Sequence, residues 1–548
     1  MIDTVRDLVF LLPNAPAAAI GKEDIGSKAH GLMRLTQLGL PVPPAFVLGT
    51  HLCREYFRNG GILSKDMREL LVRGLAKLEE ATDCRFGASR RPLLLSVRSG
   101  AAVSMPGMME TILNVGLCEQ SLRGLVRATG NPRQAWDCYR RLIRDFSEVV
   151  HGTETGPFER LVAERIEAEH IASANELDVA SLSQITKESL ETALAMTGQP
   201  FPQDPMDQLV AAVDAVFRSW NSDKAKSYRK HNGIDDDLGT AVTVQAMVFG
   251  NAGGTSGAGV GFTRDPANGE DRLYLDFLFN AQGEDVVAGK REVRESDELQ
   301  RRLPAVAAEL TRAKSVLEQE FLDMQDFEFT VENGRLFLLQ TRDGKRTPWA
   351  ALKIVIDMVR HEVITPEEGL KRLDAIPVES LERIRFADAV HAQPLATATP
   401  ASIGVAVGEI ALDSNRAAER AAGGKPVILV RESIATSDID GIMAAAGVLT
   451  TAGGRTSHAA VVARQLGKVC LVGCRGLRID EGGKACSIGG RRLFEGETLT
   501  LDGDSGTIYA GAIPVVRERP HAELAEIARW RDAVADREKT PSRGLAAG

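Results

Sequence analysis

Residues 453–473 read GGRTSHAAVVARQLGKVCLVG, and this stretch decides how the second half of the chain is interpreted. A glycine pair precedes a short polar stretch that ends at His458, and a run rich in alanine and valine continues to Arg464. This order predicts a strand that ends before the glycines and a helix that begins at the histidine. Glycines let the backbone approach a phosphate, first-turn amides bind its oxygens, and neutral imidazole accepts a phosphoryl group near pH 7. A lone histidine is more often structural, but this setting favours His458 as a nucleophile.

Short runs rich in valine and isoleucine surround the histidine segment. Strands separated by a helix are predicted at GVAVGEIAL (404–412), PVILVRES (426–433), GVLTT (447–451) and KVCLVG (468–473). The stretch AQPLATATPAS, which starts at Ala392, has the composition of a linker. We therefore predict an α/β domain over residues 391–516, preceded by a helical linker over 346–390 and followed by a helical C-terminal tail over 517–548.

The first part of the chain, residues 1–345, alternates helical and strand patterns. A helix that leads into a strand is predicted over residues 27–47, and charged helical patterns fill residues 119–235. Further strands are predicted at VTVQAMVFG (242–250), at RLYLDFLF (272–279) and in a hairpin, FEFTVENGRLFLLQTR (327–342), whose turn is Asn333-Gly334. The predicted fold class is therefore α/β and α+β, distributed over several domains.

Length and charge limit the class of protein. A chain of 548 residues exceeds what one hydrophobic core usually supports. The composition is that of a globular protein, and no run approaches the roughly 20 apolar residues of a membrane helix. The N-terminus has no basic leader before its apolar run, so we expect a cytoplasmic protein without a membrane partner. The net charge of −9 argues against nucleic-acid binding, and the seven scattered cysteines indicate free thiols.

The histidine segment closely resembles the phosphohistidine motif of PEP-utilising enzymes. Further stretches resemble the pyruvate, phosphate dikinase family in particular, namely SVRSGAAVSMPGMMETILNVG (96–116), GNAGGTSGAGVGFTRDP (250–266), NAQGEDVVAG (280–289) and QDFEFTVENGRLFLLQTRDGKRT (325–347). The resemblance implies an ATP-grasp nucleotide-binding domain over residues 1–345 with a helical insertion at about 119–235. It also implies that the domain at 391–516 swivels, that ATP is converted to AMP, and that His458 carries phosphate between two sites.

Two cationic residues and two loops in these motifs suit a nucleotide. Lys28 in GSKAHG and Arg98 in VRSG are positive charges that would neutralise a triphosphate, the arginine in bidentate fashion. The stretch 250–261 contains six glycines and predicts a loop whose backbone amides close over phosphates. Residues 105–109, MPGMM, resemble the family's second flexible loop over the nucleotide, near which Thr111 would reach a phosphate.

Oxygen ligands for a metal are predicted on the hairpin. Glu328 and Gln340 are expected on facing strands, where their oxygens suit Mg²⁺ that bridges phosphates. Arg342 is expected on the same face as Gln340, where it would stabilise the transferring phosphoryl group. The resemblance assigns catalysis to His458, Arg342, Thr456 and Arg98. It assigns nucleotide binding to Lys28, Arg98, Thr111, Gln245, Met247, Gly254, Ser256, Gly257, Gly259, Glu328, Gln340 and Arg342.

Three residues depart from the family pattern. Ala102 stands where an arginine is usual, Arg455 where a methionine is usual, and Asp276 where a glutamate is usual. Because the first change removes a charge near the phosphates, inorganic phosphate and water both stay open as acceptors of the remaining phosphoryl group. Thr456 matches a threonine that is reversibly phosphorylated in some dikinases, and the sequence leaves its regulation open.

The identity of the final phosphoryl acceptor also stays open. In the family a TIM barrel that binds pyruvate or phosphoenolpyruvate follows the phosphohistidine domain, whereas the residues after Pro514 are too few to form one. The leading hypothesis is an ATP-dependent phosphotransferase that works with a separate barrel protein. The alternatives are a stand-alone kinase for another small molecule and a non-catalytic nucleotide-binding regulator. A homo-oligomer is compatible with each of them.

Overall fold

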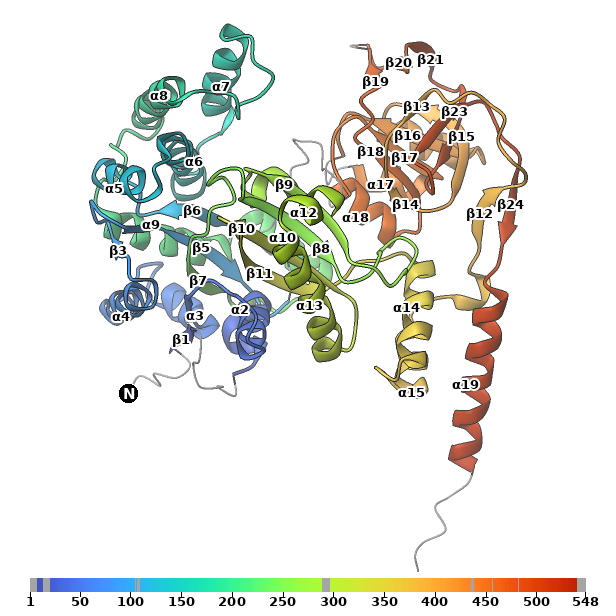
Figure 1. The fold of residues 1–548 in the computed structure, drawn as a ribbon, viewed down its shortest axis with the longest axis horizontal. Helices are drawn as coiled ribbons and strands as arrows, with labels where there is room; N and C mark the ends of the chain where they lie inside the picture. The colour runs from blue at the N-terminus through green and yellow to red at the C-terminus, as the bar shows by residue number, and fades with distance from the viewer. Residues whose placement is uncertain are drawn as a thin grey trace, which may run out of the picture. The chain divides into compact units, whose positions relative to one another are not determined.

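The computed structural model forms two compact units (Figure 1). The first comprises residues up to Ser256 together with Thr330–Thr341, and the second comprises Gly257–Phe329 and the residues from Arg342 onward. The structure describes residues 7–12, 20–103, 105, 109–287, 296–434, 438–455, 457–480 and 482–539. A mixture of helices and sheets over several structural regions was predicted from the sequence and is confirmed. The finer four-part domain division stays a prediction.

An antiparallel five-stranded sheet organises the first unit. Its order is β1-β2-β7-β5-β6, with β1 at Leu8–Leu11, β2 at Ala45–Leu48, β7 at Ala241–Ala246, β5 at Leu95–Gly100 and β6 at Thr111–Val115. Alternate side chains of a strand point to opposite faces. Val97 and Val244 therefore share one face, which packs against Leu209 and Val213 of helix α9, Pro205–Ser219. The opposite face carries polar side chains, and the candidate nucleotide residues lie there.

Helices surround this sheet as the charged periodic segments predicted. The helices at the N-terminal side are α2 at Lys22–Gln37, α3 at Thr50–Arg58 and α4 at Lys65–Thr82. The predicted helical insertion contains α5 at Glu119–Thr129, α6 at Pro132–His151, α7 at Gly156–Ala168, α8 at Val179–Thr197, α9 and α10 at Asp223–Asn232. In α6 a fully buried stripe of Ala135, Cys138, Leu142 and Ile143 joins the main core, so this helix anchors the insertion.

A second sheet has the strand order β11-β10-β8-β9. Its strands are β8 at Gly257–Phe262, β9 at Tyr274–Phe279, β10 at Gln325–Glu332 and β11 at Arg335–Asp343, with helices α11 at Gly283–Val287, α12 at Ser296–Arg302 and α13 at Pro304–Phe321 in the same part of the chain. The predicted turn between β10 and β11 is confirmed, because Asn333 and Gly334 have φ values of 50° and 78°.

The predicted glycine loop at 250–261 is wrong for its second half. Residues from Gly257 onward form the buried strand β8, in which every second residue is glycine. A Cβ on Gly257 would lie 2.2 Å from the ring of Phe277, and a Cβ on Gly259 would lie 2.5 Å from the ring of Phe329. These glycines are therefore explained by the space that phenylalanine rings occupy in the core.

Linker helices and the C-terminal helix share a core in the second unit. They are α14 at Pro348–Arg360, α15 at Pro366–Leu373 and α19 at His521–Lys539. Leu524, Ile527 and Trp530 of α19 pack on the apolar faces of α14 and α15. The helical linker is interrupted at its end by strand β12, Arg383–Phe386, which pairs with β24, Val515–Glu518.

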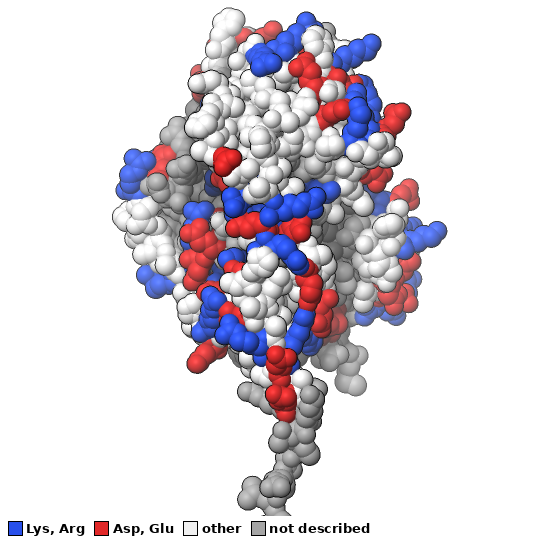
Figure 2. Space-filling view, turned by 90° about the vertical axis from the view of Figure 1, so that its right-hand side faces the viewer, with Lys and Arg blue, Asp and Glu red and all other residues white. Residues whose placement is uncertain are grey.

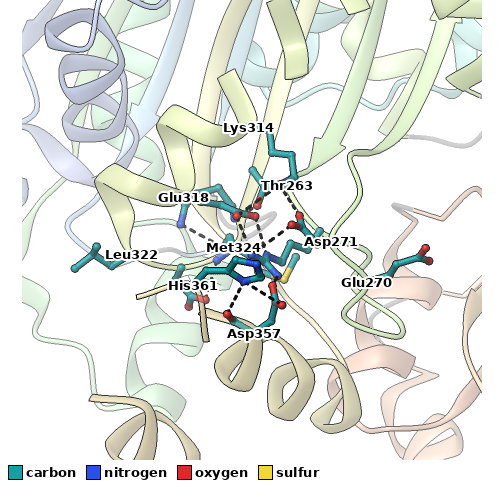
Figure 3. A network of polar contacts seen from close by, with 12 residues as sticks. Thr263, Glu270, Asp271, Lys314, Glu318, Leu322, Met324, Asp357 and His361 are labelled. Carbon is teal, nitrogen blue, oxygen red and sulfur yellow. Dashed lines mark hydrogen bonds and ion pairs between the residues drawn. The ribbon is translucent and has the colours of Figure 1, made fainter. Parts of the chain in front are cut away.

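A buried polar network fixes α14 to the strand region (Figure 3). Arg264, which is 3% exposed, makes two 3.1 Å hydrogen bonds to Glu318 of α13 and a further ion pair with Asp357 of α14. Lys314 adds a 2.6 Å contact to Asp271, and His361 lies 3.2 Å from Asp357. The FTRDP segment is thus an anchor for two helices.

The last sheet confirms the predicted α/β pattern around the histidine. Its order is β13-β23-β22-β15-β16-β17-β18-β14, with β13 at Ala396–Thr397, β14 at Thr399–Ser402, β15 at Val405–Ala411, β16 at Val427–Arg431, β17 at Gly447–Thr450, β18 at Val469–Val472, β22 at Thr498–Asp502 and β23 at Thr507–Ala510. The strands from β15 to β18 are parallel. The accompanying helices are α16 at Ser414–Ala422, α17 at Ile439–Ala444 and α18 at His458–Gln465. Helix α18 crosses from β17 to β18, which places the histidine beyond the carboxyl end of β17.

The surface and the helices limit the kinds of partner. Among the described residues no helix is long and apolar enough to cross a membrane. On the face shown in Figure 2, basic and acidic side chains are interspersed. The described residues on that face therefore form no continuous basic surface for a polyanion.

Candidate active site

The histidine segment has the predicted geometry at the level of the backbone. His458 is the first residue of α18, and the Oγ of Ser457 accepts a 3.4 Å hydrogen bond from the N–H of Ala460 as an N-cap. Gly453 has φ of 103°, and a Cβ there would lie 3.0 Å from that same hydroxyl. A glycine is therefore required for the turn that leads into the cap. Thr456 lies outside the described residues.

Arg342 forms an acid–arginine cluster on the β10–β11 hairpin. Its Nε and Nη2 atoms both lie 2.8 Å from Oδ2 of Asp326. Glu328 is close enough to act electrostatically on both residues. Burial raises the pKa of Asp326, whereas Arg342 opposes that shift. The role of Arg342 in stabilising a phosphoryl group stays a prediction.

Asp326 is a site residue that the sequence interpretation missed. It is 3% exposed, and its Oδ1 atom has no hydrogen-bond partner among the described residues. The available signal was its spacing from Glu328, because residues two apart in a strand share a face. An unbonded carboxylate oxygen beside a second carboxylate is a suitable donor set for a hard cation such as Mg²⁺.

The predicted metal pair is divided between the two units. Gln340, which is 7% exposed, belongs to the first unit, and Glu328 belongs to the second. Their convergence on one metal ion therefore stays a prediction. Within the described residues no group of three or more His, Cys, Asp and Glu side chains is placed to hold a metal.

Lys28 and Arg98 are brought together in the first unit by a close backbone contact. Gly26 interrupts α2 with φ of 77°, and a Cβ on it would lie 2.1 Å from the carbonyl oxygen of Gly100. The N–H and the hydroxyl of Ser27 both donate to the carbonyl of Ala101, at 2.9 and 3.0 Å. The start of the Lys28 helix is therefore fixed against the end of the strand that carries Arg98.

Polar residues continue this site across the sheet. Arg98 lies directly opposite Thr111 on β6 and opposite Thr243 on β7, so the three side chains share one face. The guanidinium of Arg98 also donates a 3.3 Å hydrogen bond to the carbonyl of Leu339. Thr243 is 2% exposed, and its hydroxyl has no hydrogen bond to any residue that the structure describes. This face therefore offers hydroxyl and guanidinium donors to an anion.

The proposed adenine-pocket residues follow on the same strand. Gln245 is buried, and its Nε2 donates a 3.0 Å hydrogen bond to the carbonyl of Pro43. Met247 lies just beyond β7, where its N–H donates to the carbonyl of Leu94 at 2.9 Å. Gln245 therefore lies opposite Ser96 of β5, two residues along the strand from the Thr243–Arg98 pair, while the contact of Gln245 and Met247 with adenine stays a prediction.

Only some residues of the two predicted nucleotide loops lie in loops that the structure describes. Gly254 is exposed in the remaining loop, whereas Ser256 is fully buried and its hydroxyl accepts a 2.9 Å hydrogen bond from the N–H of Asn333. Ser256 therefore has a structural role in joining the loop to the hairpin turn. Met105 packs in the core of the first unit, and the predicted residues 106–108 lie outside the described part of the chain.

Comparison with known proteins identifies the two regions that hold these residues. Residues 60–304 match the family model described as pyruvate phosphate dikinase, AMP/ATP-binding domain, and residues 423–506 match PEP-utilising enzyme, mobile domain. The chain is 42% identical over 511 residues to a pyruvate, phosphate dikinase of Clostridium symbiosum, with 93% of this chain and 58% of that protein covered. It is 41% identical over 534 residues to that of Rhizobium meliloti (strain 1021), with 95% of this chain and 59% of the relative covered.

These matches define a protein that joins a dikinase-type nucleotide-binding domain to the mobile domain of PEP-utilising enzymes. Over the region that it shares with these relatives, the chain is similar in sequence to pyruvate, phosphate dikinases. The resemblance of its motifs is thereby confirmed. The chain spans less than three-fifths of the length of these two relatives, at 58% and 59%.

Proposed function

We propose that this chain is an ATP-dependent phosphotransferase that forms phosphohistidine at His458 and releases AMP. The observation that carries the proposal is the position of His458 at the start of a capped helix whose segment reaches the nucleotide-binding region of the second unit. In this arrangement Arg464 of the histidine helix acts electrostatically on Asp326, which is the partner of Arg342. His458 and the acid–arginine cluster of Arg342 therefore belong to the same structural unit.

The proposed transfer is a displacement at the β-phosphorus of ATP. An imidazole nitrogen of His458 bonds to the β-phosphorus of ATP while the bond from that phosphorus to the α-phosphoryl oxygen breaks, and AMP leaves with the electron pair. The terminal phosphoryl group then passes to inorganic phosphate or water, which leaves one phosphate on the histidine. Arg98 and Arg342 would hold the negative oxygens, and Thr456 would lie next to the reacting group. Mg²⁺, when bound by Glu328 and Gln340 with Asp326, would neutralise charge on the phosphates.

The finer architecture belongs to the same proposal. We assign residues 1–345 to an ATP-grasp domain, 346–390 to a linker and 391–516 to a swivelling phosphohistidine domain. Lys28, Thr111, Gln245 and Met247 would contact ATP, together with the backbone of the exposed loop that contains Gly254. A separate protein that binds phosphoenolpyruvate or pyruvate would receive the phosphate, in keeping with the name pyruvate, phosphate dikinase that the relatives carry.

Replacing His458 with alanine is expected to abolish protein labelling by ATP, because no other described residue begins a glycine-preceded helix at this site. The measurement exposes purified wild type and His458→Ala to Mg²⁺ and ATP labelled at the β phosphate, and follows acid-labile protein label and AMP. Wild type should gain label and release AMP, and the variant should do neither above background. Equal labelling of both proteins, or none in wild type with or without phosphate, would contradict the proposal.

A further inference from the structure

One face of the β8–β9 strand pair meets the histidine segment. Phe262 pairs with Tyr274, and Val260 pairs with Asp276, so these four alternate residues share a face. Two arginines from the histidine segment lie over that face within the second unit. The Cζ atom of Arg455 is 4.9 Å from the ring centroid of Tyr274, and that of Arg464 is 5.3 Å from the ring centroid of Phe262. The contact is therefore built from aromatic rings and guanidinium groups.

An acidic residue lies beneath the two arginines. Asp276 is 1% exposed, and neither of its carboxylate oxygens makes a hydrogen bond with the residues that the structure describes. Arg455 and Arg464 stabilise its charge at longer range, but burial dominates and raises the pKa of Asp276 to about 6. Arg464 is fully buried and donates a 2.8 Å hydrogen bond to the carbonyl of Arg455. The opposite charges thus attract one another without direct ion-pair geometry.

This arrangement makes the contact reversible. The two cation–aromatic contacts favour the docked state, whereas an ionised carboxylate that is buried without hydrogen bonds favours separation, because separation rehydrates it. At neutral pH these two effects oppose each other at the same face. A carrier that moves between two sites requires such a contact, since a fully paired interface would hold the histidine segment in place.

Two of the three departures from the family pattern lie at this contact. Arg455 stands where a methionine is usual, and Asp276 stands where a glutamate is usual. Arg455 adds a positive charge to the histidine segment. Asp276, which faces it, is an acidic group whose pKa is raised. The proposed chemistry at His458 uses neither residue, so their pairing needs a separate explanation.

We propose that Arg455 and Asp276 are positioning residues with opposite effects: Arg455 holds the histidine segment on the β8–β9 face, and the buried carboxylate of Asp276 limits how tightly it is held. The carrier role of this contact rests on the proposed function, but the contact itself does not. Among the described residues, the other charged or titratable groups at this face are Tyr274 on the same strand and Arg464 on α18. Asp265 acts electrostatically on Tyr274, and Asp326 and Cys470 act on Arg464.

Hydrogen exchange, measured without nucleotide, tests whether Arg455 and Asp276 have opposite effects on this contact. Arg455→Met should lower protection in β9 and α18 by about 10-fold at pH 7.5, because it removes the guanidinium over Tyr274. Asp276→Asn should raise protection in the same segments at pH 7.5. At pH 5, where the wild-type carboxyl is protonated, this variant and wild type should agree after correction for intrinsic exchange. The matched control is Arg492→Met, in another part of the same unit. The Cζ atom of Arg492 lies 5.5 Å from the ring centroid of Phe494, and its Nη2 atom lies 2.6 Å from Oδ2 of Asp480.

The rate of phosphohistidine formation separates positioning from nucleotide binding. In a single turnover with labelled ATP, Arg455→Met should slow labelling about 10-fold while the Kd for ATP stays within about twofold. Arg492→Met should change neither quantity. If wild type gains no label, the proposed function fails while the exchange experiment still decides the contact. The inference is overturned if Arg455→Met and Asp276→Asn leave exchange unchanged or shift it in the same direction.

Discussion

Arg264→Met is expected to lower the free energy of unfolding of the second unit by about 3 to 5 kcal/mol. Arg264 is almost fully buried and is the common partner of Glu318 on α13 and Asp357 on α14 (Figure 3). Methionine fills a similar volume but leaves two acidic groups with reduced compensation, and Glu318 is itself only 6% exposed. The loss should be seen in urea unfolding at pH 7.5 and as faster hydrogen exchange in both helices.

Two comparisons isolate the cause of that loss. Arg360→Met removes an exposed arginine on the same helix α14, where it pairs with Glu526 at 2.6 Å, and should cost less than about 1 kcal/mol. The double variant Arg264→Met with Glu318→Met removes both charges of one pair and should recover part of the lost stability. Equal costs for Arg264→Met and Arg360→Met would show that burial of the network contributes nothing.

Local sequence patterns predicted those elements whose signal lies within a short segment. The helix that begins at His458, the strands of the last sheet and the turn at Asn333-Gly334 each carry their own cap, apolar run or glycine. Strand β12 was missed because its partner, β24, is more than 100 residues away, as the register Arg383 to Glu518 shows. Pairing across such a separation has no local signature.

The glycine-rich segment shows how one residue type supports two interpretations. Glycines permit loops over phosphates, but they also permit a strand to lie against aromatic rings. In β8 the second cause holds, because a Cβ on Gly261 would lie 2.3 Å from the ring of Phe327. Only the partner across the core decides between them, and that partner lies far along the chain.

The residue types of the candidate site were predicted from the sequence, but their arrangement in space was predicted only in part. Lys28 and Arg98 were expected by resemblance to bind phosphates, which stays a prediction, and the Gly26–Gly100 contact that joins their elements could not be read from spacing. Asp326 was missed although it lies two residues from Glu328, because only Glu328 and Gln340 were expected as oxygen ligands on the hairpin. The pairing of the buried Asp326 with the half-exposed Arg342 depends on which face the core leaves open.

Gly26→Ala is expected to reduce the rate of phosphohistidine formation on the order of 100-fold in the folded protein. Gly26 has φ of 77° and ψ of 157°, a combination that costs an L-residue about 1 to 3 kcal/mol, and the added Cβ would lie 2.1 Å from the backbone oxygen of Gly100. Neither atom belongs to a flexible side chain, so the start of the helix must move. Lys28 follows two residues later and would move away from the strand that carries Arg98.

Gly39→Ala provides the matched control for Gly26→Ala, because Gly39 has φ of 71° but no atom within 4 Å of an added Cβ. It should show the backbone cost alone, about 1 to 2 kcal/mol of stability, with an unchanged labelling rate and Kd for ATP. Gly26→Ala should raise that Kd in addition to slowing labelling, since the displaced group is a phosphate ligand in the proposed site. If both variants labelled at the wild-type rate, the backbone contact at Gly100 would not position Lys28 for catalysis. The difference between the two alanines, both at positions of positive φ, therefore measures the close approach at Gly26 together with its ψ of 157°.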